Sequence, residues 1–84
     1  MNLRNRDLRT LKIHGAILNY AKMQQVKLNF VNMANIKLLK TQLNGADLSY
    51  ANLSVVDLSG NNFVDSTNLS GANLRDSDFS GTDP

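Results

Sequence analysis

The chain has 84 residues, of which 42% are hydrophobic, 19% are charged and none is cysteine, and its formal net charge is +2. The lack of cysteine excludes disulfides, thiolate metal sites and a cysteine nucleophile. The longest apolar run, Ala16–Leu18, is too short for a transmembrane helix or a signal-peptide core. We therefore expect one small cytoplasmic domain over residues 1–84, without a membrane partner.

An apolar residue recurs at every fifth position from Leu3 to Phe63 and, after one extra residue near Ser66, at Leu69, Leu74 and Phe79. A small or apolar residue usually lies two positions before each of these centres, and the remaining positions are mostly polar. This pattern fits neither the period of a helix nor that of a long strand. All five glycines lie two positions after a centre, which predicts a corner with positive φ after each short extended piece.

In chain order, residues 1–10 place Arg6 at an inward position, so we expect an irregular end because burying an unpaired charge is costly. Residues 11–40 carry larger inward side chains and several lysines, which predicts slightly swollen, basic coils. Asn61 is a milder inward misfit next to the insertion near Ser66, which we expect to bulge outward at a corner. The repeat then resumes and continues to Gly81.

Units such as Ala46–Tyr50, Ala51–Val55 and Ala72–Asp76 resemble the A-(D/N)-L-x-x unit of pentapeptide-repeat proteins. The resemblance extends over nearly the whole chain. It implies an all-β fold, a right-handed quadrilateral β-helix in which four units form each square coil. Sixteen units would make about four coils. Side chains twenty positions apart would then lie in columns along the axis.

Charge is divided along this axis. Residues 1–40 hold eight lysines and arginines and one aspartate, a net charge of +7, whereas residues 41–84 hold one arginine and six aspartates, a net charge of −5. The basic coils suggest a nucleic-acid or other anion partner, but a groove-binding protein would gather its cations and aromatics on one stripe. Some relatives implied by the resemblance imitate DNA against a topoisomerase, which requires a long acidic rod. Nucleic-acid roles are therefore an alternative that we do not favour.

The residues that usually carry chemistry are isolated. His14 has no cysteine, glutamate or second histidine to share a metal with, and Asp76 and Asp78 lack the glycine and glutamate of a calcium loop. No Ser–His–Asp set is supported by spacing, and a filled solenoid has no cleft for a substrate. We expect no enzymatic activity, no cofactor and no metal.

The predicted function is a non-enzymatic protein-interaction or scaffold module, because exposed apolar side chains on a polar surface mark contact sites. Two surfaces are candidates. The lysine patch consists of Ile17, Tyr20 and Leu39, with Lys37 and Lys40 at its edge, and the aromatic pair consists of Phe30 and Tyr50. The alternative is that these side chains fill corners and have no partner.

The ends of the solenoid predict self-association, because an end coil leaves backbone groups and core side chains without a neighbour. The simplest homo-oligomer is a twofold dimer with stacked C-terminal coils. Head-to-tail stacking would pair opposite charges but would produce filaments.

Overall fold

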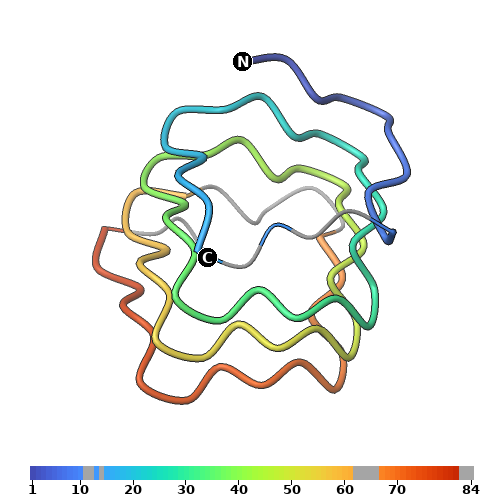
Figure 1. Cartoon of the computed structure of the whole chain (residues 1–84). Helices are drawn as coiled ribbons and strands as arrows, with labels where there is room; N and C mark the ends of the chain where they lie inside the picture. Colours follow the sequence, from blue (N-terminus) through green and yellow to red (C-terminus); the bar gives the residue numbers. More distant parts are fainter. Residues whose placement is uncertain (11–12, 14, 62–66, 82–84) are drawn as a thin grey trace.

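The computed structural model describes residues 1–10, 13, 15–61 and 67–81, and the chain winds through successive square coils (Figure 1). Within these residues, single parallel β-bridges alternate with turns, and no helix is formed. The principal extents of the molecule are 29 × 23 × 22 Å. The expected four-sided β-helix is confirmed. No helix in the described ranges is both long and apolar enough to cross a membrane.

The β-bridges fix how one coil stacks on the next. Lys22 pairs with Asn2 in the preceding coil and with Gln42 in the following coil, a separation of twenty positions in each case. Further along, Asp47 pairs with Asn68, and the separation is 21 positions. The insertion therefore adds one residue without moving any apolar centre off its column. The outward bulge predicted for it lies outside the described residues.

The apolar centres of the units point inward and form the core. In the second and third coils these side chains have no exposed surface: Met23, Leu28, Met33, Leu38, Leu43, Leu48, Leu53 and Leu58. The centres of the outer coils are less buried, and several pack against the core from the edge: Leu3, Ile13, Leu69, Leu74 and Phe79. Because a solenoid is stabilised by contacts between neighbouring coils, the two middle coils contribute most of the hydrophobic stabilisation.

Asparagine and aspartate before a centre hold the turn that follows. In nine units the Oδ1 atom of this residue accepts a hydrogen bond of 2.9–3.2 Å from the backbone N–H two positions later. The backbone N–H group at this position is not paired by the bridges between coils. The Asx turn provides its hydrogen-bond acceptor. Where Lys37 replaces the usual residue, Asn19 Oδ1 of the preceding coil accepts the Leu39 N–H at 2.9 Å.

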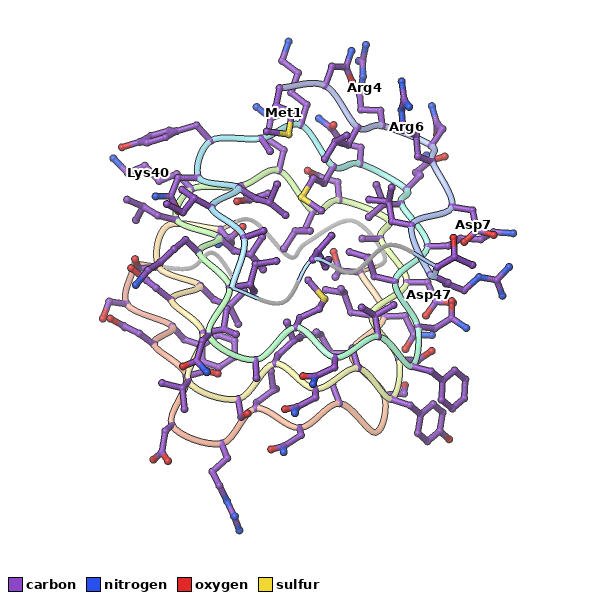
Figure 2. The ribbon with its side chains drawn as sticks, viewed as in Figure 1. Met1, Arg4, Arg6, Asp7, Lys40 and Asp47 are labelled. Carbon is purple, nitrogen blue, oxygen red and sulfur yellow. The ribbon has the colours of Figure 1, made fainter. Side chains whose placement is uncertain are left out.

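The structure shows where the two inward misfits of the sequence lie. Residues 1–10 do not form the irregular end that Arg6 suggested, because Asn2 and Asp7 bridge to the second coil in the common register. The Arg6 side chain is exposed at the edge of the first coil, whose outer side no described coil covers (Figure 2). Asn61 is buried, and its Nδ2 donates to the carbonyls of Leu38 at 2.6 Å and of Leu58 at 2.8 Å.

The corners have the predicted backbone conformation. Every residue with positive φ lies two positions after a centre, and these residues include all five glycines. Among the described residues, nine others are not glycine, and the large apolar ones are Tyr20, Phe30, Tyr50 and Val55. The left-handed conformation costs an L-residue about 1–2 kcal/mol. Such a corner directs a large side chain into solvent rather than into the core.

Val55 is the most strained of these corners, because a β-branched residue is a true outlier at positive φ (57°). We expect Val55→Asn to raise the free energy of unfolding by about 0.5–1 kcal/mol, since asparagine tolerates this conformation. Urea unfolding would measure the change. Val55→Ala is the control, because it removes the β-branch and the apolar surface but keeps an L-residue less suited to positive φ than asparagine. If both variants unfold at the wild-type urea midpoint, Val55 is not strained.

Candidate functional site

The lysine patch lies on one face of the first two coils and at its corner. Ile17 bridges to Lys37, and the Tyr20 N–H donates to the Leu39 carbonyl at 2.9 Å, so the patch is continuous from one coil to the next. Ile17 is 69% exposed and Tyr20 is 63% exposed. Leu39, at the repeat position between those of Lys37 and Lys40, is only partly exposed. The predicted members are therefore together, but Leu39 offers less surface than we expected.

Lys40 occupies the same corner as Tyr20, one coil further along, and projects from the edge of the molecule (Figure 2). Its aliphatic stem lies over the next corner, Gly60. A methyl group on Gly60 would come within 2.7 Å of Lys40 Cγ and 3.5 Å of Cε. The glycine corner thus leaves room for the stem to lie flat while the ammonium group remains in solvent.

The aromatic pair is a parallel stack on another corner. The ring centroids of Phe30 and Tyr50 are 5.0 Å apart, and the ring planes differ by 8°. The other face of Tyr50 lies against Gly71, where an added Cβ would be 2.6 Å from Cε1 and 2.7 Å from Cδ1 of the ring. Tyr50 is held from both sides, although its side chain is 60% exposed and that of Phe30 is 71% exposed.

The two candidate surfaces do not form one site. Phe30 lies two corners after Tyr20 and two corners before Lys40, so the aromatic pair and the lysine patch are at diagonally opposite edges of the square coil. A small ligand cannot touch both. Each surface must be tested separately.

Two other cations of the basic half, Arg9 and Lys27, are compensated by neighbouring aspartates. Arg9 forms an ion pair with Asp7, with 2.6 Å between Nη2 and Oδ2, and its Nε donates to Asp7 Oδ1 at 2.8 Å. Lys27 lies between Asp7 and Asp47 in a column of bridged residues, and both aspartates mark the same side of the molecule (Figure 2). These contacts hold the pKa of Asp7 below its usual range, chiefly through the Arg9 hydrogen bonds. Arg9 and Lys27 are therefore poor candidates for binding an external anion.

Hydrogen bonds from the Asx turns also lower the pKa of two other aspartates. Ser49 Oγ and Ser49 N–H donate to Asp47 Oδ1 at 2.6 and 3.0 Å, and these bonds, with smaller effects of Arg9 and Lys27, depress the Asp47 pKa. Ser80 lowers the Asp78 pKa in the same way. Since the folded pKa lies below the unfolded one, the stabilisation is present above the unfolded pKa of about 4 and is lost as the pH falls through the folded value.

We therefore expect the urea midpoint to fall as the pH is lowered below about 4. Asp47→Asn should flatten this dependence, because the amide oxygen still accepts from Ser49 but no longer titrates. Urea titrations across this pH range provide the measurement. Asp76→Asn is the matched control for charge, and an equal flattening in that variant would show that total charge, rather than the Ser49 hydrogen bonds, sets the acid sensitivity.

The residues considered for a metal site can be followed only in part. In the part of the chain that the structure describes, no three histidine, cysteine, aspartate or glutamate side chains are placed to hold a metal ion. His14 lies outside that part. Sequence reasoning missed three other residues, Lys22, Gly60 and Gly71, which border or support the two surfaces. The twenty-residue column rule was the signal for them, since Gly60 follows Lys40 and Gly71 follows Tyr50 across the insertion.

The family model for pentapeptide repeats matches eight copies over residues 36–66 and 56–83, together more than half of the chain. Among solved structures, the chain is similar to the pentapeptide-repeat protein Rfr23 of the cyanobacterium Cyanothece 51142, with a TM-score of 0.66 and 26% identity over 93% of this chain and 60% of that one. It is also similar to HetL of Nostoc sp. strain PCC 7120, a pentapeptide-repeat protein involved in heterocyst differentiation regulation, with 28% identity, a TM-score of 0.37 and coverage of 96% and 46%. No curated protein matches significantly.

This chain therefore spans less than two thirds of the length of either solved protein. Its five-residue register, its square coils and the match to Rfr23 identify the fold as a right-handed quadrilateral β-helix. The chain belongs to the pentapeptide-repeat family.

Proposed function

We propose that this domain is a non-enzymatic interaction or scaffold module that presents a rigid β-helix surface to a protein partner. The observation that carries the proposal is the exposed stack of Phe30 on Tyr50, supported from below by Gly71. Aromatic side chains dominate the energetic centres of protein interfaces, and they cost little conformational entropy when they are already ordered.

A purely structural role explains this pair poorly. Both residues lie at corners with φ near +60°, at 67° for Phe30 and 59° for Tyr50, where glycine would fit without strain, as it does at Gly45 and Gly60. Both side chains also expose most of their surface, so they contribute little to the core. A fold that needed only a corner would be better served by glycine or asparagine at each position.

Site-specific photo-crosslinking tests the proposal. A photoreactive phenylalanine analogue is placed at Phe30 in the native host, and a matched probe is placed at Val55, another exposed corner of positive φ. We expect a protein adduct of defined mass from position 30 that is absent from position 55. No adduct, or the same adducts from both positions, would contradict a specific contact at the aromatic pair.

A further inference from the structure

We propose that the lysine patch, extended by Lys22, binds an extended acidic segment of a protein partner, with an apolar side chain against Ile17 and Tyr20 and carboxylates beside Lys37 and Lys40. The inference rests on the proposed interaction function and names the chemistry of the partner at the second surface. Three observations carry it: lysines without acidic neighbours, exposed apolar surface beside them, and a change from positive to negative charge in the coils that follow the patch.

The first observation is that two of these lysines have no acidic neighbour in their columns. Lys40 lies between Tyr20 and Gly60, and Lys22 bridges to Asn2 and Gln42. Neither lysine forms an ion pair with any described residue, nor does Lys37. Lys37 has one acidic neighbour in its column, Asp57, whereas Lys27, at the same repeat position, lies between two aspartates. Positive potential is thus concentrated around this corner, where it favours an anionic partner.

The second observation is the apolar surface directly beside this charge. Ile17 bridges to Lys37 in the next coil, and Tyr20 occupies the same corner as Lys40, one coil earlier. Both apolar side chains are more than half exposed, and Leu39, at the intervening repeat position, is partly exposed. A partner that supplied only charge would leave this apolar surface in water, so a segment that combines carboxylates with an apolar anchor is the better complement.

The third observation distinguishes a peptide from a larger anionic surface. The column that begins with Ile17 and Lys37 continues to Asp57 and Asp78 in the next two coils. Adjacent coils are only about 4.8 Å apart. A bilayer or a nucleic-acid duplex laid on this face would also contact the aspartates and be repelled. A single extended chain that follows one coil can remain on the basic strip.

Fluorescence anisotropy with a defined probe tests this inference. The probe is a fluorescein-labelled peptide of alternating glutamate and leucine, and the controls are peptides of glutamate with serine and of lysine with leucine. We expect saturable binding of the first peptide, weaker binding of the second and none of the third. Amide shifts in a ¹⁵N spectrum should be confined to Ile17, Tyr20, Lys22 and residues 37–40. Equal binding of the first two peptides, or shifts elsewhere on the molecule, would overturn the proposal.

Two charge-matched variants make the test specific. Lys37→Gln with Lys40→Gln should weaken binding about tenfold, whereas Lys27→Gln with Arg9→Gln, which removes the same charge from the compensated face, should change it less than about twofold. Circular dichroism would check that both variants fold. Equal losses in the two variants would mean that only net charge matters and would refute the site.

Vesicles of phosphatidylserine and phosphatidylcholine and a short DNA duplex complete the design. One outcome is that either ligand binds more tightly than the peptide and loses this binding in the Lys37→Gln, Lys40→Gln variant. That result would overturn the proposal and identify a membrane or nucleic acid as the partner of the patch.

If no probe binds at the patch but crosslinking at Phe30 succeeds, this inference fails and the interaction function stands. If peptide binding is seen without any adduct at Phe30, the aromatic pair fails as a contact site and the lysine patch stands.

Discussion

Leu48→Lys is expected to leave the domain unfolded at room temperature. Leu48 has no exposed surface and lies in the middle of an inward column between Leu28 and Leu69. Loss of the leucine contacts alone costs about 2–5 kcal/mol. Burial of an unpaired ammonium group adds several kcal/mol, and small domains have only about 5–15 kcal/mol of total stability. The β signal in the far-ultraviolet circular dichroism and the dispersion of the amide spectrum should both disappear.

The matched control places the same charge on the outside. Ser70 is exposed, and its hydrogen bonds are made by its backbone: its N–H donates to Asn68 Oδ1 and its carbonyl accepts from the Tyr50 N–H. Ser70→Lys should therefore shift the urea midpoint by no more than a surface substitution does, about 0.5 kcal/mol. A folded Leu48→Lys variant, or an equally unfolded Ser70→Lys variant, would show that the inward and outward assignments are wrong.

Much of the fold follows from the five-residue register because each position of the unit has one environment. The centres face the core, nearly all described residues two positions later adopt positive φ, and the positions before the centres form bridges, as Leu48, Gly71 and Asn52 illustrate. The insertion was also predictable, because the apolar series shifts by one residue between Phe63 and Leu69. Periodicity repeats the same environment many times, so single exceptions do not obscure it.

The exceptions required coordinates. The register placed Arg6 in the core, but a coil with one open side lets that side chain turn outward, and the end keeps its bridges. The register also placed Leu39 on the surface, but the residue that directly follows a centre is only partly exposed throughout the two middle coils, and Leu39 shares this environment. The register did place Lys27 in a column between Asp7 and Asp47, but the ion pair of Arg9 with Asp7 depends on side-chain reach, which a repeat pattern does not specify.

For the candidate surfaces, the sequence predicted which residues share an edge but not what holds them there. The column rule placed Phe30 next to Tyr50, whereas the parallel ring geometry and the support by Gly71 appear only in the structure. The same holds for Lys40, whose stem lies on Gly60. A glycine two positions after a centre therefore has two roles: it relieves the corner, and it leaves space for the side chain of the preceding coil.

Gly71→Ala is expected to destabilise the domain more than Gly15→Ala, although both glycines have nearly the same φ, 70° and 74°. An alanine in the left-handed conformation costs about 1–2 kcal/mol at either position. At Gly15 the new methyl group meets no described atom within 4 Å, so only this backbone cost applies. At Gly71 it would lie 2.6 Å from Tyr50 Cε1, so the ring must also leave its place on the stack.

A double-mutant cycle separates the two costs. Tyr50→Ala removes the ring, so Gly71→Ala in that background should cost only as much as Gly15→Ala does in the wild type. The difference between the two backgrounds, measured from urea midpoints, is the free energy that holds Tyr50 between Phe30 and Gly71. If the two glycine variants are equally destabilised in the wild type, the ring moves aside freely and the aromatic pair is not preorganised. The cycle would then remove the main physical support for the aromatic pair as a contact site.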